Sequence, residues 1–209
     1  MRYRFGGCVA LLRVCFVRYG LNFTVNRFLE TRFMRSSTLP ATPAALSLYL
    51  LGSWTLSKTL QYTRGGRSGT FLGEARFSPL SDAVLSYEET GKATLLPDNE
   101  QYEARHALLY DFSDNNDRGI VRVSFDEASD RSSVEGRVEA ARFFHNIDFA
   151  QPDLPFQHPC GPDMYYGRLL CSSQDAFVLD WRVEGPRKLG RVVSKFSRRK
   201  QGKVAESAL

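Results

Sequence analysis

The chain of 209 residues is predicted to form one antiparallel, all-β domain over residues 47–200. From Pro43 onward, short segments alternate apolar and polar side chains with a period of two, as half-buried strands do. Glycine, proline, asparagine and aspartate separate these segments at fairly regular intervals. With 43% hydrophobic residues, the chain can bury an ordinary core. About nine strands at this spacing imply a closed barrel or a sandwich.

Residues 1–40 differ from this domain, because they hold seven arginines against the single acidic residue Glu30 and are rich in serine and threonine. This composition is typical of a mitochondrial transit peptide, and Arg13 interrupts the apolar run that a secretory signal would need. We therefore expect a basic, poorly structured leader and a mitochondrial location. The alternative is that Met34 is the true start, in which case the protein would be cytoplasmic.

One helix is predicted, over residues 43–51, where it would serve as a lid or plug for the β domain. Predicted turns lie at residues 64–66, 97–99 and 114–117. The predicted strands are residues 54–62, 69–78, 84–89, 102–112, 120–125, 138–149, 163–171, 176–184 and 191–197.

The net charge of +5 is concentrated at the two ends of the chain. Residues 187–209 hold eight basic residues against Glu206, whereas residues 41–186 hold 13 basic and 21 acidic residues. An acidic body argues against a nucleic-acid-binding face on the domain. The tail, residues 201–209, is expected to be disordered, with binding to RNA or anionic lipid as the alternative. No run approaches the roughly 20 apolar residues that a transmembrane helix needs.

The four cysteines do not suggest a disulfide framework or a zinc site. Cys8 and Cys15 lie in the leader, and Cys160 and Cys171 are too far apart in sequence for a Cys-x-x-Cys motif. Free thiols in a reducing compartment are the simpler interpretation.

Gly52-Ser53-Trp54 opens the first predicted strand, and a cation near the last strand, Arg198 or Lys195, could lie across the indole face. This arrangement resembles the lipocalin and calycin barrels, in which Gly-x-Trp on the first strand meets an arginine near the end of the chain. The resemblance implies that Gly52 and Trp54 are structural and close one end of a barrel.

Further segments resemble a family known as domain of unknown function 6314. They are residues 144–148, 158–167 and 181–188, together with Gly52-x-Trp54, Gly73-x-Ala75-x-Phe77 and Tyr87-Glu88-Glu89-x-Gly91, so that the resemblance covers about residues 49–198. Lys58 stands where the family pattern has an arginine. The spacing from Arg105 to the next aromatic residue is also longer than in the family pattern. The resemblance implies a lipocalin-like barrel and no established activity. Together with the strand pattern, we predict a lipocalin-like (calycin) barrel of about nine antiparallel strands with a short N-terminal helix.

Four other positions are predicted to be structural: Trp181, Gly185, Pro186 and Lys188. Gly185 and Pro186 are expected to form the last hairpin turn, with Lys188 at its edge. The alternative is that Arg187 and Lys188 lie at the rim of a pocket and contact an acidic ligand.

Reactive side chains are densest at His158, Cys160, Asp163 and Tyr165. If a strand begins at Asp163, the side chains of Asp163 and Tyr165 point to the same face. A buried carboxylate is costly unless it is paired, so Asp163 would need a partner. The candidate partners are Arg105, Arg142 and His145.

Several functions fit this cluster. A metal site would use His145, His158, Cys160 and Asp163, but the His-x-Cys spacing is shorter than in the usual zinc loops, and we predict no metal. A Cys-His nucleophile pair would lack any oxyanion motif. Non-covalent recognition of a ligand is the hypothesis we favour. The predicted ligand-binding residues are His158, Cys160, Asp163, Tyr165, His145 and Arg105.

A purely structural role is the competing interpretation of the same segment. His158-Pro159 and Gly161-Pro162 would then shape a rigid turn, with Cys160 as a small buried filler and Asp163 as its cap.

We therefore expect a barrel that binds a small apolar or amphipathic molecule, with residues 158–165 at its mouth. Binding predicts a roomy cavity on which polar groups converge. An enzyme, the first alternative, predicts a histidine within hydrogen-bond reach of Cys160, Asp163 or Tyr165. A non-catalytic subunit or assembly factor of a mitochondrial complex, the second alternative, predicts a filled barrel with an exposed apolar patch. The sequence specifies neither a cofactor nor an oligomeric state.

Overall fold

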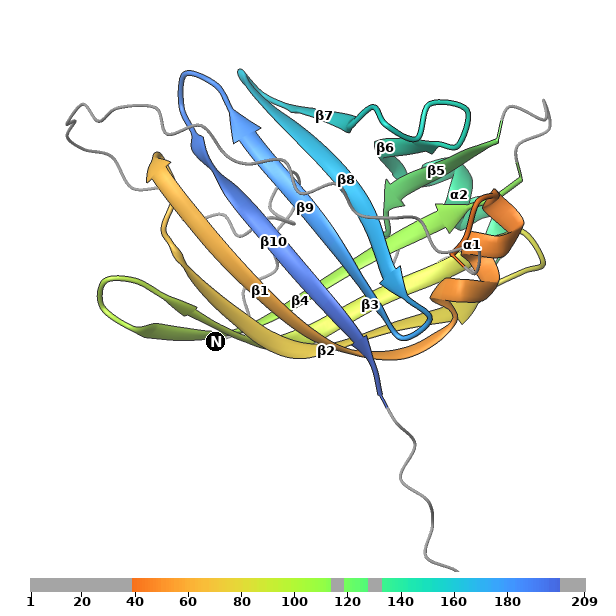
Figure 1. The fold of residues 1–209 in the computed structure, drawn as a ribbon, viewed down its shortest axis with the longest axis horizontal. Coiled ribbons are helices and arrows are strands. Elements are labelled where there is room, and N and C mark those ends of the chain that lie inside the picture. Colours follow the sequence, from red (N-terminus) through yellow and green to blue (C-terminus); the bar gives the residue numbers. More distant parts are fainter. Residues whose placement is uncertain (1–38, 114–118, 128–132, 200–209) are drawn as a thin grey trace, which may run out of the picture.

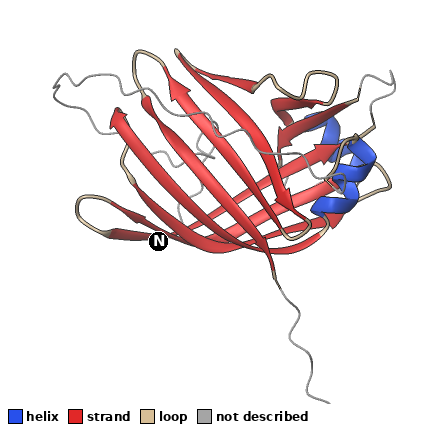
Figure 2. Ribbon diagram, viewed as in Figure 1, coloured by secondary structure: helices blue, strands red, loops and turns tan. Residues whose placement is uncertain are grey.

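The computed structural model describes residues 39–113, 119–127 and 133–199, so most of the predicted leader, the turn at 114–117 and the tail lie outside the described residues. Its main element is a single ten-stranded antiparallel sheet that curls into a nearly closed barrel (Figure 1, Figure 2). The strand order is β6-β5-β4-β3-β2-β1-β10-β9-β8-β7. The strands are β1 (Gly52–Arg64), β2 (Gly69–Pro79), β3 (Val84–Leu95), β4 (Glu100–Asp111), β5 (Ile120–Phe125), β6 (Arg142–Asp148), β7 (Phe156–Cys160), β8 (Asp163–Ser173), β9 (Ala176–Glu184) and β10 (Leu189–Arg198).

The predicted all-β barrel is confirmed, and β5 and β9 have the predicted bounds. Two elements differ from the prediction. Residues 138–140 were expected in a strand but belong to the short helix α2 (Val134–Ala140), whose N-cap Ser133 accepts a hydrogen bond from the Gly136 N–H at 3.1 Å. Strand β7 was not among the predicted strands, and the competing structural interpretation placed His158-Pro159 in a rigid turn. Proline is tolerated there because β7 is an edge strand.

Helix α1 (Pro43–Leu50) forms where the sequence predicts it and lies at one end of the barrel (Figure 1). Thr42 caps its first turn, and Pro43 provides a fixed φ at the helix start. Leu46 and Leu50 are buried in the hydrophobic core. Among the described residues, no helix has the length and apolar character needed to cross a membrane.

Trp54 and Arg198 close the end of the barrel at which α1 lies, as the Gly-x-Trp motif predicts. Trp54 is fully buried and donates from Nε1 to the Leu50 carbonyl at 2.8 Å. The Arg198 guanidinium lies 4.1 Å from the Trp54 ring centroid and donates to the carbonyls of Tyr49 and Leu51 at 2.7 and 2.8 Å. Arg198, and not Lys195, is therefore the cation over the indole. It also satisfies carbonyl groups that the helix end leaves without partners.

The barrel ring is interrupted between β6 and β7, the two ends of the strand order, where no backbone ladder is formed in the described part of the chain. We call this junction the seam. Across it, His158 Nδ1 lies 2.9 Å from the Phe144 carbonyl oxygen. The His145 ring stacks on Phe156 with centroids 4.3 Å apart. Side chains thus join the seam where backbone hydrogen bonds do not.

Candidate functional site

Asp163, a predicted ligand-binding residue, supports the last hairpin turn. Its Oδ1 accepts hydrogen bonds from the backbone N–H groups of Arg187 and Lys188 at 2.9 and 3.0 Å. A Cβ at Gly185 would lie 2.3 Å from the same oxygen, so only glycine fits at that position. The partners of this buried carboxylate are backbone amides, and not Arg105, Arg142 or His145 as the sequence suggested.

Tyr165 and Cys160 lie near the same turn. Tyr165 is almost completely buried, and Lys188 Nζ donates to its hydroxyl at 3.1 Å. Cys160 is partly buried against the core, and Cys160 and Cys171 are not joined by a disulfide bond. Lys188, which was predicted to lie at the edge of the last hairpin turn, thus also contacts the predicted ligand-binding cluster, and it does so by its hydrogen bond to Tyr165.

Arg105 lies apart from that group, but His158 adjoins it. His158 pairs with Tyr165 across β7 and β8, with ring centroids 6.1 Å apart. His158 faces the Phe144 carbonyl at the seam. Arg105 points to the outer face of the sheet, where it pairs with Glu88 at 3.1 Å and remains two-thirds exposed. The structure therefore brings together four of the predicted ligand-binding residues on the paired strands β7 and β8: His158, Cys160, Asp163 and Tyr165. His145 lies across the seam from them, and Arg105 is on the outer surface. Within the described ranges, no group of three or more potential metal ligands is close enough together to hold an ion.

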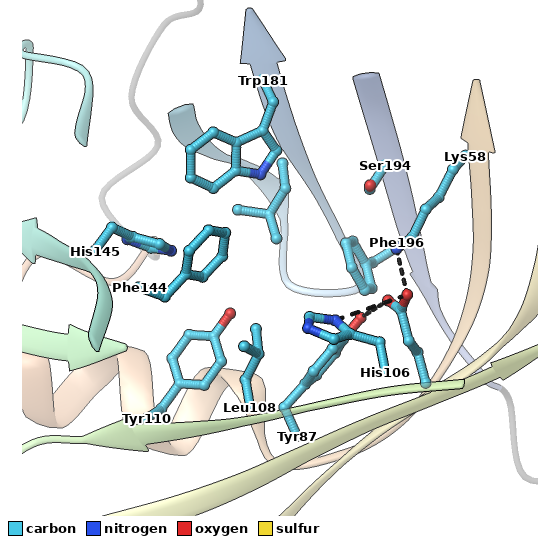
Figure 3. Close-up of a pocket in the computed structure, with 12 residues that line it drawn as sticks. Lys58, Tyr87, His106, Leu108, Tyr110, Phe144, His145, Trp181, Ser194 and Phe196 are labelled. Carbon is cyan, nitrogen blue, oxygen red and sulfur yellow. Dashed lines mark hydrogen bonds and ion pairs between the residues drawn. The ribbon is translucent and has the colours of Figure 1, made fainter. Parts of the chain in front are cut away.

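A different group of polar side chains lies inside the barrel, and we call it the central polar cluster: Lys58, Tyr87, Glu89 and His106. Lys58 Nζ forms an ion pair with Glu89 Oε1, and the Tyr87 hydroxyl donates to Glu89 Oε2 (Figure 3). His106 Nδ1 lies 4.0 Å from Glu89 Oε1. Strands β1, β3 and β4 supply these side chains, so the cluster exists only when the sheet is curled.

The strand alternation explains why these residues point inward. On β1, Trp54, Leu56, Lys58 and Leu60 are all buried, at every second position. Lys58 thus occupies a position in that series where an apolar residue would be expected. From the sequence, Lys58 stood out only as a departure from the family pattern, and His106 was not predicted to be a site residue. A charged residue within an inward-facing series was the signal that could have identified the cluster.

The charges in the cluster balance. Burial alone would raise the pKa of Glu89, but the Lys58 ammonium, with His106 and the Tyr87 hydroxyl, holds this pKa below its usual value. Glu89 is therefore ionised at neutral pH. Burial lowers the pKa of His106 to about 4 and that of His145 to about 3, so both imidazoles are neutral.

A cavity adjoins the central polar cluster and has a volume of about 30 Å³. This is room for on the order of one or two water molecules. Most of its wall is apolar or aromatic (Figure 3). The side chains that complete the wall around the cluster are Leu108, Tyr110, Phe144, His145, Leu179, Trp181, Ser194 and Phe196.

Some polar atoms of the wall lack partners. His106 Nε2 and His145 Nδ1 are buried and have no hydrogen-bond partner among the described residues. Tyr110 directs its hydroxyl toward the space between Phe144 and His106 (Figure 3). Because buried polar groups in folded proteins are nearly always hydrogen-bonded, the unpaired imidazole nitrogens call for an explanation.

The curled sheet, the helix at its end and the Trp54–Arg198 closure define a lipocalin-like, or calycin-like, β-barrel. Within this class, the chain belongs to the family of unknown function DUF6314, whose model matches residues 50–198. No curated protein matches the chain in sequence.

Solved structures with a similar barrel share little sequence with it. The S-type phycobiliprotein lyase CPES from Guillardia theta is 8% identical, with a TM-score of 0.48, 77% of this chain covered and 94% of that chain. Rv2717c from M. tuberculosis is 12% identical, with a TM-score of 0.41 and coverages of 76% and 98%. The redesigned β-barrel mFAP1, solved with DFHBI bound, is 13% identical, with a TM-score of 0.36 and coverages of 73% and 97%.

Proposed function

We propose that this protein binds a small, partly apolar molecule inside the barrel, in the cavity beside the central polar cluster. The observation that carries the proposal is the combination of a buried Lys58–Glu89 ion pair with two neutral histidines that present unpaired nitrogens. An apolar wall with a few convergent polar groups is the usual character of a ligand site.

Stability alone does not account for this interior. Replacing a buried ion pair by apolar residues of similar volume is often neutral or stabilising. Leaving a buried donor or acceptor unpaired costs about 1–3 kcal/mol. A barrel selected only for stability would thus hold apolar residues at Lys58, Glu89 and His106. Their presence supports a ligand-binding role for this interior.

The small cavity limits how a ligand enters. A molecule larger than about two waters fits only if part of the wall moves outward. Phe144 and His145 belong to β6, which lacks a backbone ladder on its seam side within the described residues. We propose that this part of the wall yields to the ligand, while β1, β3 and β4 hold the polar cluster fixed.

Native and denaturing mass spectrometry of the full chain, purified from its own host, test the proposal. A stoichiometric small molecule that is lost on denaturation is expected. Its occupancy should fall in Tyr110→Phe, which changes the cavity wall. It should be unchanged in Arg105→Ala, which alters only the outer face. A bare polypeptide mass, together with a melting temperature that no compound of a metabolite library raises, would contradict the proposal.

A second candidate function, a non-catalytic subunit or assembly factor of a mitochondrial complex, is favoured by the small size of the cavity. For this role the barrel needs only to be filled, and a partner would cover exposed apolar side chains such as Leu72 and Leu154. Co-purification of a stoichiometric protein partner that Leu72→Ser or Leu154→Ser releases would favour this candidate.

A further inference from the structure

We infer that the group held in this cavity is uncharged and presents both a hydrogen-bond donor and an acceptor, as a carboxamide does. The inference rests on the proposed function and specifies its ligand class. It follows from two features of the cavity: a wall without net charge, and unpaired polar atoms of complementary kinds.

The charge balance of the wall excludes an ion. Among the lining residues, Lys58 and Glu89 are the only ones charged at neutral pH, and they neutralise each other. Burial keeps both histidines neutral and raises the pKa of Tyr87 and Tyr110. An anion could bind Lys58 only by leaving Glu89 buried without its cation. A cation could bind Glu89 only at the expense of Lys58. Either outcome leaves an uncompensated buried charge.

The unpaired atoms call for both a donor and an acceptor. With His106 Nδ1 4.0 Å from Glu89 Oε1, electrostatic attraction favours the tautomer that carries its proton on Nδ1. His106 Nε2 then offers a buried lone pair to a ligand N–H or O–H group. The Tyr110 hydroxyl, which has no hydrogen bond to another described residue, can donate to a ligand oxygen.

The aromatic wall fits a planar group. The rings of Phe144 and Trp181 are stacked with centroids 5.2 Å apart and an interplanar angle of 26°, and Phe196 lines another side. A carboxamide is flat and carries its donor and acceptor in one plane. Once the seam side of the wall has moved outward, it can therefore lie against these rings and reach His106 and Tyr110 at its polar edge.

Three small probes with the same heavy-atom skeleton separate the alternatives: acetamide is neutral, acetate is an anion and acetamidinium is a cation. They are titrated into the full chain labelled with 15N at tryptophan. The chain has two tryptophans, so two indole N–H signals are observed, and Trp181→Phe assigns them. Trp54 lies at the closed end of the barrel and serves as the internal control.

Acetamide should shift the Trp181 signal saturably and leave the Trp54 signal in place. Acetate and acetamidinium should bind about tenfold more weakly or worse, since each brings an unbalanced charge. His106→Leu should weaken acetamide binding by about tenfold without lowering the melting temperature, because it removes an unpaired nitrogen. Tyr110→Phe provides a second test should His106→Leu fail to fold. Arg105→Ala should bind like the wild type.

Two results would overturn the inference. If acetate or acetamidinium binds more tightly than acetamide, the ligand class is wrong, although interior binding stands. If none of the probes moves the Trp181 signal, the cavity does not accept a carboxamide, and the inference fails. Mass spectrometry then decides the broader proposal separately, because a bound molecule without a carboxamide-like group would leave that proposal intact.

Discussion

Lys58 and Glu89 face each other across the barrel interior from β1 and β3, which are separated by β2. Their pairing depends on the curvature of the sheet, and not on strand neighbours. A pattern of alternating residues can show that Lys58 points inward. It cannot show that Glu89 is the carboxylate that meets it. For this reason the chemically dense segment 158–165 was predicted as the candidate site, and the central polar cluster was not predicted.

A double-mutant cycle measures this pair. Lys58→Met alone leaves a buried carboxylate without its cation, and Glu89→Gln alone leaves a buried ammonium, so each should lower the free energy of unfolding by about 3–5 kcal/mol. The double variant should recover most of the loss, because the glutamine still accepts from Tyr87 and no charge remains buried. Urea unfolding at pH 7 gives the four values. A double variant no more stable than the single variants would contradict a buried ion pair.

The neutral histidines predict a pH dependence of stability. His106 and His145 have folded-state pKa values of about 4 and about 3, below the ordinary 6.5, so the unfolded chain binds protons that the folded chain does not. The contribution of these histidines to stability should be constant above about pH 7.5. It should fall as the pH drops from about 6.5 toward 4, by up to about 1.4 kcal/mol per pH unit for each histidine. The lowered pKa of His158 adds a change of the same sign.

His145→Phe tests this assignment, since it keeps an aromatic ring against Phe156. Its unfolding free energy, measured between pH 5 and 8, should decline less steeply on acidification than that of the wild type. The difference in slope should correspond to close to one proton fewer taken up on unfolding. An unchanged slope would mean that His145 titrates normally.

At the scale of elements, the closure of one barrel end was predicted well because its residues are close in sequence or lie at the ends of the domain. The Gly-x-Trp motif, the helix before it and a cation near the last strand are all local patterns. Strand β7 was missed because its status is set by a neighbouring strand. The His-Pro pair of β7 forms a strand only because it pairs with β8 and leaves its other edge without a ladder.

Arg198→Met and Lys195→Met form a matched pair for this closure. Arg198→Met removes the hydrogen bonds to Tyr49 and Leu51 and the contact with Trp54, so it should lower the free energy of unfolding by about 2 kcal/mol or more. Lys195 is exposed on the same strand, and its loss should cost less than about 0.5 kcal/mol. Urea unfolding followed by tryptophan fluorescence provides the comparison. Equal losses would show that the guanidinium does not hold the helix end.

For the whole molecule, the fold was predictable because a meander of alternating strands with local turns leaves few arrangements, and the Trp54 motif favoured the barrel over the sandwich. The interior was less predictable. The volume of the cavity depends on how the side chains of many strands fit together, and this packing cannot be derived from any single segment of the sequence. The leader remains a prediction of composition alone.

Residues 1–40 fused to a fluorescent protein test the leader. We expect mitochondrial fluorescence, and we expect replacement of Arg2, Arg13 and Arg27 by glutamine to abolish it, because import depends on positive charge. The N-terminal residue of the protein isolated from its host is the complementary measurement. Diffuse fluorescence with a native chain that begins at Met34 would favour the cytoplasmic alternative.

The strand order also has a consequence for the connectivity of the chain. The first and last strands in sequence, β1 and β10, pair in the middle of the sheet, whereas the seam separates β6 from β7, which are consecutive in sequence. A circular permutant that is opened between β6 and β7 and joined from β10 to α1 would run through the sheet from β7 to β6 in spatial order. Every ladder would then connect strands that are adjacent in sequence. The contact order would fall, and the rearranged chain should fold faster than the natural one around the same cavity.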